Sequence, residues 1–244
     1  MNPYTFFWKS SIGKKWLVAL TGLVWVGYVF GHLIGNLQVF AGPQGINAYA
    51  ELLHSKPLLL WMARIFLIIS LVLHIVATLK IRWESRQARP VPYAKKADVQ
   101  AKLAAKTMAI SGLTVLAFII YHLLHLTIRA TDSRFKPLSE GGLLQGTSDV
   151  YTMMVLGFGN PIVSLFYVIG VGLLCMHLSH GFSSMLQTLG INSRKLMTPL
   201  SLGGRILAAL VFIGYASIPI GVWSGALKLT PPAVLIVPAT TVNQ

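Results

Sequence analysis

Acidic residues and cysteine are both scarce in this chain of 244 residues. It contains only six Asp and Glu residues and one cysteine, Cys175. A single cysteine cannot form a disulfide within the chain. So few carboxylates disfavour a carboxylate-dependent hydrolase or a dedicated calcium site. Charged residues make up only 11% of the sequence, whereas soluble domains contain about 25%.

The sequence contains several long apolar segments. Hydrophobic residues make up 55% of the chain, and the mean hydropathy is +0.68. Crossing a bilayer takes about 20 apolar residues, and only helices or closed barrels satisfy their backbone in lipid. The alternation typical of a barrel is absent, and no cleavable signal peptide is expected. The sequence therefore predicts an all-α membrane protein, one domain over residues 1–244, with five transmembrane helices at about 16–40, 57–81, 106–128, 161–187 and 203–227.

The basic residues predict how these helices are oriented. The net charge is +14, and 14 of the 20 Lys and Arg residues precede the first helix or lie in the loops after the second and fourth. Cytoplasmic loops carry such an excess, so we expect a cytoplasmic N-terminus and an external C-terminus. The charge is attributed to this rule and to anionic lipid, not to nucleic acid. We expect segment 82–106 to form a basic cytoplasmic docking surface and segment 149–158 a short helix on the outer surface.

Four of the seven histidines lie deep inside these apolar stretches. A histidine in lipid is costly unless it is paired, handles protons or binds a metal. At about 1.5 Å per residue, His32 and His122 fall at one level near the outer face, and His74 and His177 at a second level near the inner face. The two levels are about 15–18 Å apart.

A six-coordinate haem takes one imidazole on each side of its iron. A lone intramembrane histidine more often bonds a neighbouring helix or lines a proton path. Those roles give no reason for four histidines on four antiparallel helices to agree in depth. The pattern thus favours two b haems inside the bundle, a distal one bound by His32 and His122 and a proximal one bound by His74 and His177.

The remaining polar residues allow several roles. His125 and His180 each follow a proposed ligand by three residues, so each could contact a haem propionate, relay protons or be the true ligand if the register is off by a turn. Glu51 and His54 could pass protons to a quinone near the outer haem, or form a solvated surface pair. Quinone-binding or proton-handling candidates are Glu51, His54 and His125; propionate candidates are Lys80, Arg82 and Trp83 at the inner face, Arg129 at the outer face, and His180.

Three other classes of membrane protein fit the histidines less well. Cytochromes b of quinol–cytochrome c oxidoreductases stack two ligands on one helix, and no helix here has that spacing. Di-iron desaturases cluster about eight histidines at the cytoplasmic edge, and this chain has only seven. A transporter or channel needs a polar path across the membrane, but Asp and Glu are absent from the predicted helix interiors.

Four segments resemble the cytochrome b membrane anchor of bacterial succinate dehydrogenases and fumarate reductases, in its single-subunit, two-haem form. They are FGHLIGN around His32, LVLHIVATLKI around His74, GLTVLAFIIYHLL around His122 and CMHLSHGFSSMLQTLGI around His177. The resemblance implies five helices, a cytoplasmic N-terminus and the same four haem ligands. It covers residues 14–227.

The resemblance also implies a function, a set of partners and a location. The anchor passes electrons between an iron–sulfur subunit and a membrane quinone, menaquinone rather than ubiquinone. It has no succinate site of its own. A flavoprotein subunit and the iron–sulfur subunit dock on its cytoplasmic side, in the bacterial cytoplasmic membrane, and the complex could oligomerise. Two alternatives stay open: the dihaem anchor of a different dehydrogenase, and a haem-free membrane protein that conducts protons through histidines.

Overall fold

The described part of the chain is entirely helical. The structure is a computed structural model that describes residues 2, 5–88, 103–135, 149–191 and 193–229. Within these ranges no strand occurs. Five helices are long and apolar enough to cross a membrane, as the sequence predicted. They are α1 (Ser11–Asn36), α3 (Pro57–Gln87), α4 (Leu103–His122) with its extension η3 (Leu123–Thr127), α6 (Pro161–Thr188) and α7 (Arg194–Trp223).

The helix boundaries differ from the predicted ones mainly at polar ends. Helix α3 continues six residues past its predicted end at residue 81, and α7 begins nine residues before its predicted start at residue 203. Lys, Arg, Glu and Gln are good helix formers in water, so a helix extends beyond its apolar part. Segment 82–106 is therefore helical at both ends, and its middle, residues 89–102, lies outside the described residues.

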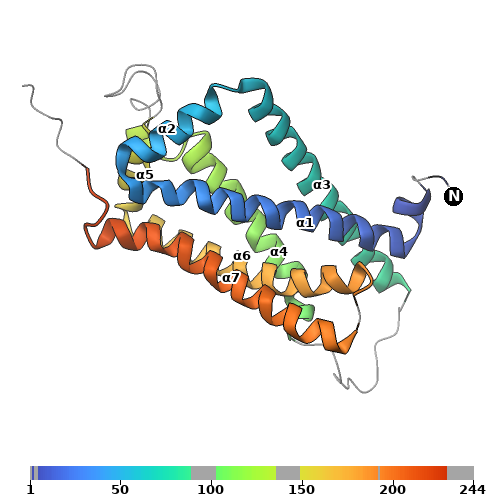
Figure 1. The fold of residues 1–244 in the computed structure, drawn as a ribbon. Helices are drawn as coiled ribbons and strands as arrows, with labels where there is room; N and C mark the ends of the chain where they lie inside the picture. Colours follow the sequence, from blue (N-terminus) through green and yellow to red (C-terminus); the bar gives the residue numbers. More distant parts are fainter. Residues whose placement is uncertain (1, 3–4, 89–102, 136–148, 192, 230–244) are drawn as a thin grey trace, which may run out of the picture.

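The long helices form a bundle in which α1 and α6 hold central positions. Helix α1 packs against α3, α6 and α7, and α6 also packs against α4 and α7. Figure 1 shows the N-terminus at one end of this bundle and α2 and α5 at the other. We call the first, where α1 begins and α3 ends, the N-terminal end. The second, where α1 ends and α3 begins, is the far end.

The far end is built from short elements that the sequence did not fully predict. Helix α1 passes through a 3-10 turn, η2 (Leu37–Ala41), into α2 (Gly42–His54), a helix that was not expected. Helix α5 (Val150–Phe158) matches the expected short helix, but it does not lie on the surface. Most of its residues are buried, because it packs against α2, α6 and α7.

Polar contacts fasten α5 in this position. The Asn47 side chain donates to Asp149 Oδ1 and accepts from the Tyr151 backbone N–H, each at 3.0 Å. On the other side of α5, Trp223 Nε1 donates to the Phe158 carbonyl at 3.2 Å. These bonds give a buried helix end the partners it would otherwise lack. Helices α2, α5 and α7 are thereby joined at the far end.

A buried ion pair ties α1 to α3 at the N-terminal end. Lys14 is 1% exposed, and its Nζ lies 2.6 Å from Glu84 Oε2. The π-helical segment η1 (Thr5–Lys9) folds over this pair, and Lys80 Nζ lies 5.6 Å from the centre of the Trp8 ring. Two histidine-bearing helices are thus held in register near their ends.

Replacing Lys14 by Met should destabilise the protein by about 2 kcal/mol, because Glu84 loses its partner while it stays partly buried. The thermal unfolding midpoint of the purified protein in detergent measures this. Lys15→Met is the matched control, since Lys15 is the exposed next residue of the same helix. Equal midpoints for the two variants would contradict the stabilising role of the ion pair.

Candidate haem sites

His32 of α1 and His122 of α4 meet near the far end, and we call them the far pair. Their ring centroids are 5.9 Å apart and the ring planes are at 84°. Two imidazoles bound on opposite sides of one metal ion, each at about 2 Å, hold their centroids roughly 6 Å apart. Within the described residues, no ring nitrogen of His32 or His122 takes part in a hydrogen bond. The nitrogens of both rings therefore remain free for a ligand. The separation suits a bis-imidazole site.

Aromatic rings enclose the far pair. Tyr28 stacks on His32 at a centroid distance of 5.3 Å, and Tyr215 lies 6.3 Å from it. Phe118 and Tyr167 lie 6.2 Å and 5.9 Å from His122. These rings fix the imidazoles by packing and keep their surroundings largely apolar.

His74 of α3 and His177 of α6 are the other two predicted ligands, and both lie closer to the N-terminal end. They interact electrostatically with each other, and we call them the near pair. His74 Nδ1 lies 3.1 Å from Thr21 Oγ1 of α1. His177 Nδ1 lies 3.1 Å from Ser111 Oγ of α4. In each case the hydroxyl belongs to the neighbouring helix. The Val18 backbone of α1 also interacts with the His74 ring, and within the described residues no hydrogen bond is found at either Nε2.

A glycine follows each of these hydroxyl residues and faces the same ring. A Cβ atom on Gly22 would lie 3.5 Å from His74 Cε1, and one on Gly112 would lie 3.4 Å from His177 Cε1. All four histidines of the two pairs are only half-buried, although their helices are packed. The absence of a side chain at these two glycines lets each ring lie close to the backbone of the neighbouring helix.

The two pairs lie at two levels of the bundle. Thr21 precedes His32 by eleven residues on α1, and Ser111 precedes His122 by eleven residues on α4. Eleven residues correspond to about 16 Å along a helix axis. The surrounding letters also agree, TGL at residues 21–23 and SGL at residues 111–113. The structure therefore repeats one layout on two helices and brings together His32 and His122, which the sequence had placed at one depth.

His125 has a different environment from these four. It lies in the π-helical turn η3 and is 1% exposed. Its Nδ1 lies 3.0 Å from the Tyr167 hydroxyl, and Phe135 and Gly157 pack against its ring. No space is left beside this ring for a macrocycle, so a one-turn error in the assignment of His122 finds no support. A proton-handling role for His125 stays a prediction.

His180, the other late histidine of α6, is exposed. It lines a shallow groove between α6 and α7, together with Met176 and Phe212. His180 therefore lies on the surface of the bundle, whereas the His177 ring is turned towards Ser111 inside it. A propionate role for His180 stays a prediction.

The remaining quinone and propionate candidates lie at the two ends. Glu51 and His54 are exposed on α2 at the far end. His54 Nδ1 lies 2.7 Å from the carbonyl oxygen of Ala50, one turn earlier in the same helix. At the N-terminal end Lys80 faces Trp8, Trp83 is exposed and Arg82 is half-buried. The structure brings none of these five into contact with a proposed ligand.

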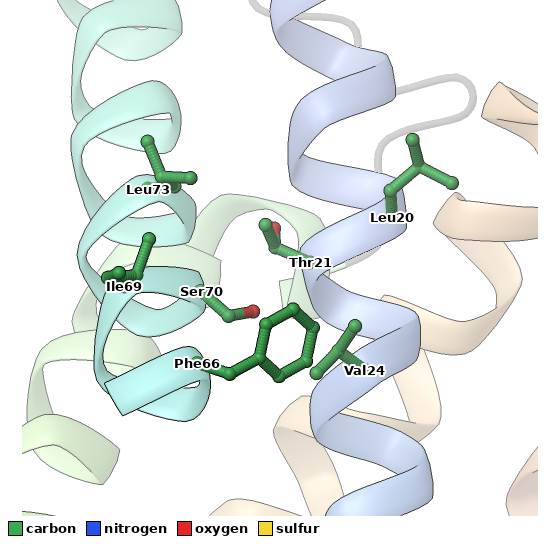
Figure 2. A pocket seen from close by; sticks show the side chains of 7 residues that line it. All are labelled: Leu20, Thr21, Val24, Phe66, Ile69, Ser70 and Leu73. Atoms are coloured by element: carbon green, nitrogen blue, oxygen red, sulfur yellow. The ribbon is translucent and has the colours of Figure 1, made fainter. Parts of the chain in front are cut away.

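Three buried polar atoms have no hydrogen-bond partner within the described residues: Trp25 Nε1, Ser70 Oγ and Arg129 Nε. A buried unsatisfied polar atom costs about 1–3 kcal/mol. Ser70 lies one turn before His74 on α3 and lines a cavity of about 180 Å³ between α1 and α3. Figure 2 shows its oxygen and the Thr21 side chain pointing into the space between the two helices. Such donors fit the oxygen atoms of a ligand, and a propionate role for Arg129 stays a prediction.

Sequence reasoning missed several residues of these sites. Thr21, Ser111, Tyr28 and Tyr167 were not singled out, although the eleven-residue spacing after TG and SG was visible in the sequence. Arg64 of α3 was counted only as a basic residue. Its guanidinium lies 5.1 Å from the centre of the Trp61 ring, and it interacts electrostatically with Tyr28, which stacks on His32.

The histidines are paired and not clustered. Within the described ranges no group of three or more His, Cys, Asp or Glu residues could hold a metal ion. A haem iron needs only two protein ligands, so pairs suffice for it. Comparison with family models, curated proteins and solved structures finds no match to this chain. The geometry of the pairs therefore carries the functional argument.

Proposed function

We propose that this chain is the membrane anchor and dihaem cytochrome b subunit of a succinate:quinone oxidoreductase. The observation that supports this best is the layout of the two histidine pairs. Each pair takes one imidazole from α1 or α3 and one from α4 or α6, and the levels are eleven residues apart on both α1 and α4. Packing or proton transfer alone does not require this agreement.

His32 and His122 would hold the distal haem, and His74 and His177 the proximal one. A b haem at each pair would carry one electron at a time. The chain supplies the axial nitrogens, an apolar aromatic surrounding that excludes water, and unpaired donors for polar edges. Thr21 and Ser111 orient the proximal ligands, and the aromatic rings around His32 and His122 orient the distal ones.

The charge distribution supports a cytoplasmic N-terminal end, where a flavoprotein subunit and an iron–sulfur subunit would dock. Electrons would then pass between the iron–sulfur subunit and a quinone by way of the near and then the far pair. Menaquinone is the quinone we propose, in the bacterial cytoplasmic membrane. Glu51, His54 and His125 lie in or beside the far end and are the proposed proton-handling groups there. Succinate would bind to the flavoprotein and not to this chain.

A haem-free proton conductor is the competing function. The hydrogen bond between buried His125 and Tyr167, next to His122, favours it, because linked rings of this kind can pass protons. It would give no role to the near pair, whose histidines are bonded to hydroxyls at a separate level.

A haem count separates these functions. The chain, purified with its partners from native membranes, should show a reduced-minus-oxidised spectrum of b type, and a pyridine haemochrome assay should give two haems per chain. Flavoprotein and iron–sulfur polypeptides should co-purify and support succinate-driven quinone reduction. Absence of haem would overturn the proposal. Two haems with a different dehydrogenase partner would retain the dihaem anchor and overturn the succinate assignment.

A further inference from the structure

Each hydroxyl group beside the near pair also has a carbonyl acceptor within its own helix. Thr21 Oγ1 lies 2.7 Å from the Leu17 carbonyl of its own helix. Ser111 Oγ lies 2.9 Å from the Met108 carbonyl. A hydroxyl has one proton to donate and two lone pairs to accept with. Since each proton is used within its own helix, each oxygen is left as an acceptor for the imidazole.

This direction determines the tautomer of the histidines. If Thr21 and Ser111 accept, then Nδ1 of His74 and of His177 must carry the proton. A neutral imidazole has one N–H and one bare nitrogen, so Nε2 keeps its lone pair. Nε2 is the atom that a metal ion would bind in this geometry.

We propose that Thr21 and Ser111 are positioning residues that hold the near pair in its metal-binding tautomer, whereas no hydroxyl group in the described part of the chain bonds a far-pair imidazole. This rests on the proposed dihaem function. An accepting partner at Nδ1 also makes the imidazole a stronger donor to its metal. A haem at the near pair would thereby be held more tightly, and its oxidised state would be stabilised. No proton leaves Nδ1 when the iron takes up its one electron.

Valine variants test the proposal because valine lacks the hydroxyl. Valine matches threonine in shape, and at residue 111, where it is larger than serine, Ser111→Thr controls for the added volume. In protein that contains haem, Thr21→Val and Ser111→Val should each weaken retention of the same single haem by about 10-fold to 100-fold. They should also raise the midpoint potential of that haem and leave the other unchanged. Thr21→Ser and Ser111→Thr should restore the wild-type values. Thr114→Val is the matched control, because Thr114 is exposed on α4 and bonds only its own Ile110 carbonyl.

Two results would overturn the inference. One is a pair of valine variants that leave both haems unchanged. The other is a pair of variants that affect different haems, since both hydroxyls must act on one site.

Failure of the proposed function is distinguishable from failure of this inference. If the wild-type chain contains no haem, the dihaem function is lost, but the tautomers can still be read by ¹⁵N NMR of histidine-labelled full-length protein. The signals of His74 and His177, identified with His→Gln variants, should show a protonated Nδ1. Thr21→Val should convert His74, and Ser111→Val should convert His177, to a mixture of tautomers. Protonation at Nε2 in the wild-type chain would overturn the inference.

Discussion

A His122→Ala variant should contain one b haem per chain in place of two, and a His177→Ala variant should lose the other haem. In the proposed dihaem layout each haem would depend on two axial ligands from different helices, and the far and near pairs share no residue. The measurement is the pyridine haemochrome count, together with potentiometric titration of the reduced-minus-oxidised spectrum. Each variant should retain a different one of the two wild-type midpoint potentials. Succinate-driven quinone reduction should be lost in both, because the relay between the ends of the bundle is interrupted.

His180→Ala provides the control for this series. His180 lies one turn after His177 on the same helix but is exposed at the groove between α6 and α7, so its variant should keep both haems. Loss of both haems from a folded His122→Ala chain would contradict two independent sites. If His180→Ala instead lost a haem, the near-pair ligand on α6 would be His180 and not His177.

Gly170→Ala should destabilise the protein although alanine is the better helix former. A Cβ atom on Gly170 would lie 2.3 Å from Phe118 Cδ2, at the contact between α6 and α4. Alanine in place of a helical glycine ordinarily gains about 0.5–1 kcal/mol, but overpacking a tight contact costs about 1–3 kcal/mol. Phe118 also neighbours His122, so occupancy of the far-pair haem should fall with stability. The thermal midpoint and the haem count measure both effects.

Gly203→Ala is the matched control, since no atom lies within 4 Å of its added Cβ. It should be neutral or slightly stabilising. In a Phe118→Ala background, Gly170→Ala should cause no further destabilisation, because the ring that its Cβ atom would clash with is gone. If Gly170→Ala stabilises the protein as Gly203→Ala does, Phe118 of α4 does not pack closely against Gly170 of α6.

The long helices could be predicted from sequence because apolar length alone determines them. Counting depth at a constant rise also placed His32 and His122 at one level, where their rings meet. The helix ends were less predictable, because polar residues such as those after residue 81 extend a helix in water as readily as they end one.

Features that depend on contacts between helices could not be derived in this way. Thr21 and Ser111 are ordinary helix residues until a second helix places a histidine opposite them. The enclosure of His125 depends on a π-helical turn, which no hydrophobic periodicity reveals. Burial of α5 depends on Asn47 and Asp149, which are 102 residues apart in the chain.

The division of ligands between helices has a consequence for biogenesis. The first helical hairpin, α1 and α3, provides His32 and His74, and the second, α4 and α6, provides His122 and His177. Neither hairpin alone contains both ligands of either proposed site. During synthesis, the proposed far site would therefore be complete only after α4 has been inserted, and the proposed near site only after α6 has been inserted. The cofactor would then join an early and a late product of translation, so haem supply would determine how much of the chain escapes proteolytic quality control.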